Sequence, residues 1–181
     1  MRALVVYESM FGNTKQVADA IGEGVRSQVA TELVEVNDAP REIGADVMLV
    51  VGGPTHAFGM SRAKTRQDAM TQAGKDPASA GIGLREWLES LDHADDATRA
   101  AAFDTHIDKR VPGSAARAAE KRLRKLGFRI VEPAESFYVS GTPGPLVQGE
   151  LERARRWGEL LGASLPETAT GELNQPSRGT R

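Results

Sequence analysis

The chain has 181 residues, a formal net charge of −2 and a pI near 6.0, which is enough sequence for one packed domain and too little for two ordinary ones. This charge balance gives the whole protein no electrostatic reason to bind nucleic acid or an anionic membrane. The absence of cysteine excludes disulfides, thiolate nucleophiles and iron–sulfur ligation, so redox chemistry needs a bound cofactor. With no basic leader and no long apolar run, we expect a soluble cytoplasmic protein.

Strand-like and helix-like segments alternate along the first part of the chain. Residues 3–7 are a short apolar run typical of a strand covered on both faces, and apolar side chains recur at helical spacing over residues 17–25. Residues 31–36 predict a weaker strand at a sheet edge, because two glutamates interrupt it. Residues 46–51 are an unbroken apolar run that stops at Gly52-Gly53-Pro54, which predicts a central strand.

The alternation continues to the end of a predicted domain at residues 1–165. Residues 60–83 are polar and punctuated by glycine and proline, so we expect a partial helix and a loop. The next predicted elements are a helix at 84–91, a strand at 99–103, a helix at 114–126, a strand at 135–139 and a helix at 147–161. Residues 166–181 have almost no apolar content, which predicts a disordered tail.

Five such alternations require crossover connections between strands. The predicted class is therefore α/β, with a doubly wound, five-stranded parallel sheet between two helical layers. In these sheets the ligand binds beyond the carboxyl ends of the strands, where the winding direction reverses. We therefore examine the segments that follow the first, third and fourth predicted strands.

The segment after the first strand predicts an anion-binding loop. It reads Ser9-Met10-Phe11-Gly12-Asn13-Thr14 and leads directly into a helix, whose N-terminal amides can bind an anion. Gly12 lets the backbone approach a ligand, and Ser9 and Thr14 can donate hydrogen bonds to phosphate oxygens. A monophosphate fits best, because neither a P-loop lysine nor a Gly-x-Gly-x-x-Gly motif is present. The alternative is an ordinary turn in which Asn13 or Thr14 caps the helix.

This loop resembles the phosphate loop of flavodoxins, which usually alternates hydroxyl residues around one glycine. The resemblance covers about residues 3–161, and it implies noncovalent binding of FMN, electron transfer and the strand order 2-1-3-4-5. Phe11 departs from the family pattern, because many flavodoxins have a further threonine or serine at this position. One phosphate donor is thereby lost.

The segment after the third strand is the one that, by this resemblance, lies along the isoalloxazine ring. Its candidate cofactor-binding residues are Pro54, Thr55, His56, Ala57, Phe58 and Gly59. It also resembles the Pro-Thr-x-Phe-Gly segment of flavodoxin-like quinone reductases, with one residue added. We expect Phe58 to stack on the ring and His56 to hydrogen-bond to it. The alternatives are packing beneath the loop for Phe58 and a solvated loop position for His56.

The segment after the fourth strand contributes Asp104, Thr105 and His106, and Gly113 lies just before the next helix. The resemblance implies that backbone amides of this loop face the pyrimidine end of the flavin. Classical flavodoxins commonly have a stacking aromatic residue here, whereas this chain has none. His106 is the nearest substitute.

Three charged segments bear on possible partners. The basic stretch at residues 61–66 has two interpretations, a site for an anionic substrate such as a nicotinamide dinucleotide phosphate or a solvated helix start. We expect the acidic run at residues 86–96 to face solvent, and docking of a basic redox partner is the alternative. Residues 117–129 are basic but have no interleaved aromatics, so we expect a solvated helix face and no nucleic-acid binding.

These patterns favour an FMN-binding electron-transfer protein that serves redox partner proteins, with the chemistry on the flavin and no catalytic side chain or metal. One alternative is an oxidoreductase that takes hydride from NAD(P)H and reduces a quinone. A second is a flavodoxin-like domain that has lost FMN, consistent with Phe11 and the missing aromatic. A receiver domain is disfavoured, because only Glu8 follows the first strand and Gly52-Gly53-Pro54 stands where a phosphorylatable aspartate is needed.

Overall fold

A computed structural model describes residues 1–56, 58–76, 80–95, 97–107 and 112–165. Ala57 and the tail at residues 166–181 therefore lie outside the described residues, and the tail's predicted disorder stays a prediction. Within the described part of the chain, no helix is long and apolar enough to cross a bilayer.

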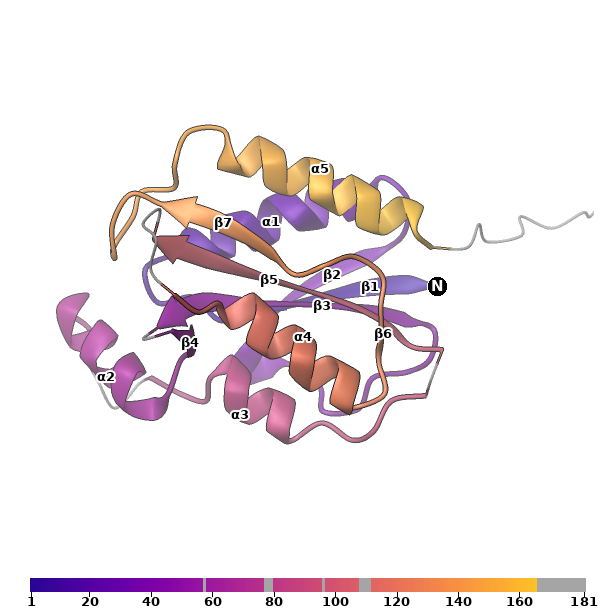
Figure 1. Ribbon diagram of the computed structural model, residues 1–181, viewed down its shortest axis with the longest axis horizontal. Coiled ribbons are helices and arrows are strands. Elements are labelled where there is room, and N and C mark those ends of the chain that lie inside the picture. Colours follow the sequence, from indigo (N-terminus) through magenta and orange to yellow (C-terminus); the bar gives the residue numbers. More distant parts are fainter. Residues whose placement is uncertain (57, 77–79, 96, 108–111, 166–181) are drawn as a thin grey trace, which may run out of the picture.

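A parallel sheet forms the middle layer of the molecule (Figure 1). Its principal strands are β1 (Arg2–Tyr7), β2 (Thr31–Glu35), β3 (Val47–His56), β5 (Arg99–Ile107) and β7 (Glu135–Val139), in the spatial order β2-β1-β3-β5-β7. The short β6 (Arg129–Ile130) pairs with the start of β5, and β4 (Gly59–Met60) pairs antiparallel with β3. Because β6 and β7 share the fifth position, this is the predicted order 2-1-3-4-5.

Helices cover both faces of the sheet (Figure 1). One face carries α1 (Asn13–Arg26) and α5 (Glu150–Ala163), and the other carries α3 (Leu84–Glu89) and α4 (Ala115–Lys125). A single 3-10 turn, Val36–Asp38, follows β2, and α2 (Ala63–Gln72) follows β4 beside the carboxyl edge of the sheet. The three predicted layers are thus confirmed.

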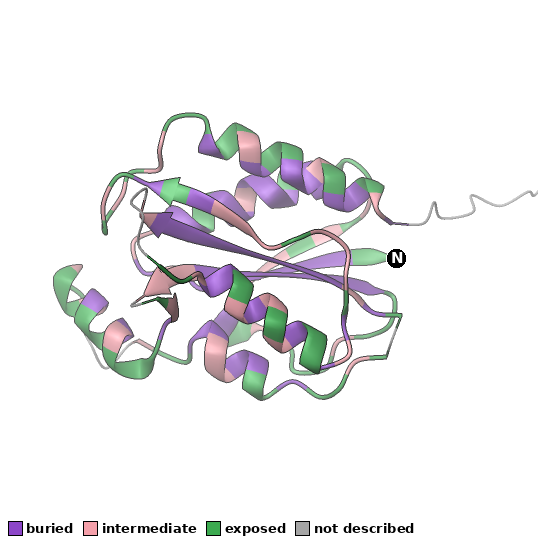
Figure 2. Ribbon diagram, in the orientation of Figure 1, coloured by how far each residue is buried: buried purple, intermediate pink, exposed green. Residues whose placement is uncertain are grey.

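The core lies between these layers, as the buried strands of Figure 2 show. Val50 and Phe103 of the sheet share one core with Trp157 of α5, whereas Leu49 shares the other with Trp87 of α3. Alternate residues of β3 therefore contribute to opposite cores, as expected for a parallel strand that is buried on both faces. Both tryptophans lie in the core.

The two helices on the first face approach each other closely. A methyl group added to Gly24 of α1 would collide with the backbone of Arg155, and one added to Gly158 of α5 would collide with the backbone of Ile21. Glycine at both positions is therefore what allows the helix backbones to come into contact.

β3 extends further than predicted, through Gly52 and Pro54 to His56. It pairs with β5 up to the partners Pro54 and Thr105, whereas β1 pairs with it only as far as Gly52. The Gly52 carbonyl accepts from the Glu8 amide, so the backbone of Pro54, two residues on, also points to the β1 side. β1 has ended there, so the missing N–H of proline interrupts no pairing.

β5 also exceeds its predicted end at Phe103 and continues to Ile107. Asp104, Thr105 and His106 were expected in a loop, but they lie within the strand, because β3 pairs on one side of this stretch and β7 on the other. Pairing on both sides thus overrides the polar composition of the segment.

Candidate functional site

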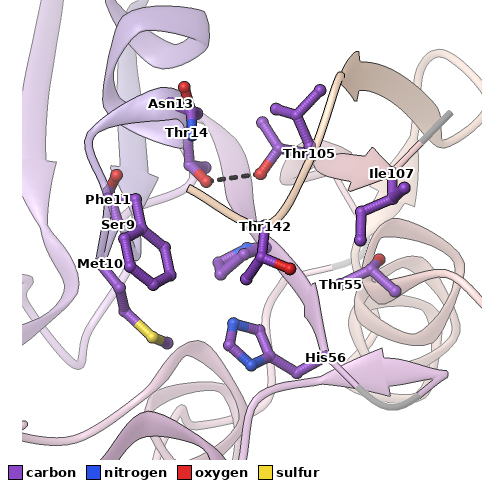
Figure 3. A pocket seen from close by; sticks show the side chains of 12 residues that line it. Ser9, Met10, Phe11, Asn13, Thr14, Thr55, His56, Thr105, Ile107 and Thr142 are labelled. Atoms are coloured by element: carbon purple, nitrogen blue, oxygen red, sulfur yellow. Dashed lines mark hydrogen bonds between the residues drawn. The ribbon is translucent and has the colours of Figure 1, made fainter. Parts of the chain in front are cut away.

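A cavity of about 230 Å³ opens at the carboxyl edge of the sheet (Figure 3). Four segments line it, with the residues Ser9, Met10, Phe11, Asn13 and Thr14, then Pro54, Thr55 and His56, then Thr105 and Ile107, and finally Val139 and Thr142. A wider hollow shares Ser9, Met10 and Phe11 with this cavity and extends past Gly12 to Lys15 and Lys75. β2 lies on one side of β1 and β3 on the other, so the winding direction of the sheet reverses at β1. The cavity lies at this reversal, which is the ligand position expected for this topology.

The loop before α1 leaves the start of that helix without a side-chain cap. Gly12 is the N-cap residue with φ +88°, a left-handed conformation that favours glycine. The amides of Asn13 and Thr14 have no acceptor among the described residues, and the Asn13 side chain instead donates to the Pro143 carbonyl at 3.1 Å. Uncapped amides at a helix N-terminus are an anion-binding arrangement. The structure therefore differs from the alternative in which Asn13 or Thr14 caps the helix.

Two threonine hydroxyls join this loop to the sheet. The Oγ1 atoms of Thr14 and Thr105 are 2.8 Å apart and buried, as the dashed line in Figure 3 shows. Because only one of the two hydrogens is used in this bond, the other remains to be donated. Ser9 is similar, since its Oγ accepts from the Lys15 amide at 3.2 Å and its own hydrogen stays available. The cavity thus offers hydroxyl donors beside the uncapped amides.

Asp104 is fully buried and supports α4 instead of lining the cavity. Its Oδ2 accepts hydrogen bonds from the Thr55 hydroxyl (2.9 Å), the Ser114 hydroxyl (2.6 Å) and the Ala116 amide (2.9 Å). Thr55 in turn accepts from the Ala115 amide at 2.8 Å. These contacts hold the N-terminus of α4 against the ends of β3 and β5.

Strand alternation separates the three predicted site residues of β5. Thr105 and Ile107 face the cavity, whereas Asp104 and His106 point to the opposite side. His106 and Gly113 both line another cavity beside α4. In a loop all three side chains could reach one ligand, as predicted, whereas in a strand only alternate residues can.

The predicted site residues around the β3–β4 connection differ in whether they line the cavity. His56 lines the cavity, and burial together with the positive charge of Arg66 lowers the pKa of its imidazole, which is therefore neutral near pH 7. Gly59 pairs with His56 in the short antiparallel ladder. Phe58 has φ +77° and a side chain that is 62% exposed, outside the cavity lining. Stacking of Phe58 on a flavin therefore stays a prediction.

A buried polar network lies beneath this connection. The Glu8 carboxylate accepts from the Ser61 hydroxyl at 2.5 Å and from the Leu84 amide at 2.8 Å, and burial raises its pKa. Arg66 is only 3% exposed, donates to Ser61 and forms a two-pronged ion pair with Glu86 at 3.1 Å. The predicted basic stretch is thus divided, because Arg66 is internal while Arg62 and Lys64 are exposed.

The other charged segments lie mostly on the surface. Glu89, Asp92 and Asp95 face solvent as expected, Glu86 is held by Arg66, and Asp96 is outside the described residues. The basic face of α4 is also solvated. Among the residues that the structure describes, no group of histidine, aspartate and glutamate could hold a metal ion.

Sequence reasoning missed three residues that line the cavity, namely Ile107, Val139 and Thr142. Ile107 follows Thr105 by two residues, and its partner in β7 is Val139. The period of two along a strand could have identified Ile107 once β5 was known to continue. Thr142 follows the last strand, and the position of the winding reversal pointed only to the segments after the first, third and fourth predicted strands.

Comparison with known proteins agrees with this architecture. A family model described as Flavodoxin matches residues 5–158. Flavodoxin 1 from Bacillus cereus has a TM-score of 0.64 at 19% identity, covering 92% of this chain and 100% of its own. A flavodoxin from Streptococcus pneumoniae TIGR4 has a TM-score of 0.61 at 17% identity (91% and 100% covered), and an archaeal flavodoxin has 0.58 at 21% (90% and 97%).

No curated protein sequence matched the chain. At these low identities the structural similarities establish the fold, and the family model adds a match over most of the chain. On that match, the protein belongs to the flavodoxin family.

Proposed function

We propose that this protein binds FMN at the cavity of Figure 3 and passes electrons between redox partners. The observation that carries the proposal is the uncapped N-terminus of α1, which opens on a cavity at the carboxyl edge of the sheet. Family membership supports a flavin as the cofactor. When bound, FMN supplies one- and two-electron chemistry at its ring system, and the protein supplies binding and electrostatics.

The residues present fit a flavin with a single phosphate. The free amides of Asn13 and Thr14, with the hydroxyls of Ser9 and Thr14, would hold the phosphate, and Lys15 is already paired with Asp19 at 2.8 Å. This set suits one terminal phosphate better than a triphosphate, for which a P-loop lysine would be needed. Pro54, Thr55 and His56 would border the ring system.

The lining residues place no carboxylate next to the ligand. With His56 neutral near pH 7, none of the twelve lining residues carries a charge. Negative charge that builds up on a reduced cofactor would therefore meet no repulsion from this lining, whereas a carboxylate about 4 Å away would cost about 4 kcal/mol near a protein surface.

The test of this function is cofactor binding by the purified protein. We expect a yellow protein, or an apoprotein that binds FMN much more tightly than riboflavin, because riboflavin lacks the phosphate. Thr14→Ala should weaken FMN binding by about tenfold through loss of a hydrogen bond to a charged group, with riboflavin binding unchanged. Thr71→Ala on the exposed surface of α2 is the matched control. A colourless protein that ignores FMN would contradict the proposal.

A second candidate is an NAD(P)H-dependent quinone oxidoreductase that uses the same FMN. Arg62 and Lys64 favour it, because both side chains are exposed and neither forms an ion pair with a described residue. Such cations can attract the phosphates of a nicotinamide dinucleotide.

A further inference from the structure

A second cavity, of about 260 Å³, lies on the other side of β5 from the proposed flavin site. It is formed by the start of α4 and by β7, and its lining includes His106, Ser114, Arg117, Ser136 and Tyr138. None of these five side chains lines the proposed FMN site. Because Thr105 and Ile107 flank His106 in sequence and face the first cavity, one strand separates the two cavities.

His106 presents one ring nitrogen without a partner. The residue is only 8% exposed, and its Nδ1 lies 2.7 Å from the carbonyl oxygen of Ile107. Because a carbonyl only accepts, Nδ1 carries the hydrogen and Nε2 is the basic nitrogen of the neutral ring. Nε2 has no hydrogen-bond partner among the described residues, although the ring is held edge-to-face against Tyr138 with centroids 6.3 Å apart.

The charges around this cavity favour an anion. Arg117 is exposed and has no ion pair with any described residue, and the hydroxyls of Ser136 and Tyr138 likewise have no acceptor there. Of the nearby carboxylates, Asp104 binds the start of α4 through Oδ2 and does not line the cavity, although its buried Oδ1 has no partner, and Glu135 pairs with Arg153. The lining therefore contains one free cation and free hydroxyl donors, with no carboxylate among its described residues.

The start of α4 does not itself supply the binding groups. Its first amides are already bonded, Ala115 to Thr55, Ala116 to Asp104 and Arg117 to Ser114. Recognition must therefore come from side chains, and the combination of guanidinium, hydroxyls and imidazole suits an oxyanion.

We propose that this cavity binds the carboxylate or phosphate group of a small acid. Arg117 donates to the oxyanion, the hydroxyls of Ser136 and Tyr138 complete its coordination, and the ring of His106 borders the bound group. The site does not depend on bound FMN. An anion bound there would bring a negative charge that can dissociate to within one strand of the proposed cofactor.

The experiment is an NMR titration of the histidine rings in the FMN-loaded protein, in which FMN already occupies the phosphate loop. The chain has three histidines, so comparison with His106→Gln assigns the signals of His106. Inorganic phosphate, acetate and chloride are titrated separately at constant ionic strength. We expect saturable shifts of the His106 ring signals with phosphate or acetate, because the ring borders the cavity, and no such response to chloride. The stronger of the two oxyanions identifies the ligand class.

Two variants test the assignment of Arg117. Arg117→Ala, an exposed position that should not affect folding, should weaken the response by about tenfold. Arg124→Ala is the control, because Arg124 lies on the same helix and pairs with Glu120. No response at His106, an equal response to chloride or an unchanged response in Arg117→Ala would overturn the proposal. If the protein fails to bind FMN, the same titration of the apoprotein still tests this site, so the two proposals fail separately.

Discussion

Glu8 shows how a single side chain can make stability depend on pH. Its carboxyl group is almost fully buried between Ser61 and Leu84, and burial raises its pKa above the ordinary value of 4.5. The folded protein therefore binds this proton more strongly than the unfolded chain. The resulting stabilisation is complete below about pH 4.5 and is lost as the pH rises through the folded pKa.

Glu8→Gln should remove this pH dependence while keeping an acceptor for the Leu84 amide. We expect the free energy of unfolding of the wild type, relative to the variant, to increase as the pH is lowered from about 7 to 4.5. Urea denaturation at several pH values measures this difference. Glu89→Gln, at an exposed position of α3, should give a difference that does not vary with pH in this way. A constant difference for Glu8→Gln would show that Glu8 titrates normally.

Sequence reasoning at the residue scale was most successful in the loop before α1. Hydroxyl residues around a glycine, directly followed by helical periodicity, predicted what the structure shows at Ser9, Gly12 and Thr14. Asp104 and His106 were grouped with Thr105 because side-chain direction depends on strand pairing, which a single segment does not reveal.

At the scale of elements, α4 is fixed to the sheet through its N-terminus. Ser114 caps it locally by accepting from the Arg117 amide, and Asp104 of β5 accepts from Ala116 and from Ser114 itself. Thr55 adds a bond from β3. A helix whose first turn is held by two neighbouring strands positions the second cavity as well as the first.

Removing these contacts should have graded effects. We expect Asp104→Ala to lower the free energy of unfolding by about 3 kcal/mol, because it leaves a buried amide and two hydroxyls without their charged acceptor. Ser114→Ala should cost about 1 kcal/mol, the usual effect of losing a helix cap. Urea denaturation measures both, and Asp68→Ala on the exposed side of α2 should stay within about 0.5 kcal/mol of the wild type. Equal effects at Asp104 and Ser114 would argue against a central role for Asp104.

The lengths of β3 and β5 could not have been predicted from their own residues. Gly52, Gly53 and Pro54 are turn-forming residues, and Asp104 to His106 are polar, so both segments have the composition of loops. They become strands because they pair with each other, and because β7 pairs with the end of β5, and this information lies in other parts of the chain. Elements with strong internal patterns, such as α4 and β7, were predicted close to their observed limits.

On the scale of the whole molecule, the two candidate functions differ in whether the protein acts alone. An electron carrier needs partner proteins, whereas an oxidoreductase oxidises NADH or NADPH and reduces a quinone by itself. We expect the FMN-loaded protein alone to show no steady oxidation of either nucleotide with added quinone. Sustained turnover that is weakened by Arg62→Ala together with Lys64→Ala would instead support the oxidoreductase, since exposed cations near the site would then bind the nucleotide.

The whole fold was predictable because alternation of five strands with helices leaves few topologies. Doubly wound layers follow from the crossover rule, and the ligand position follows from the layers. The strand order itself came from the family resemblance, and the observed pairing agrees with it.

The glycine contact between α1 and α5 links the last helix to the first loop. Because neither Gly24 nor Gly158 leaves room for a methyl group, the two helices cannot slide past each other without breaking backbone contact. α1 begins at the proposed phosphate site, so its position depends on a segment more than a hundred residues later in the chain. A substitution that separates these two helices would therefore disturb the proposed phosphate site from a distance, without touching any residue that lines it.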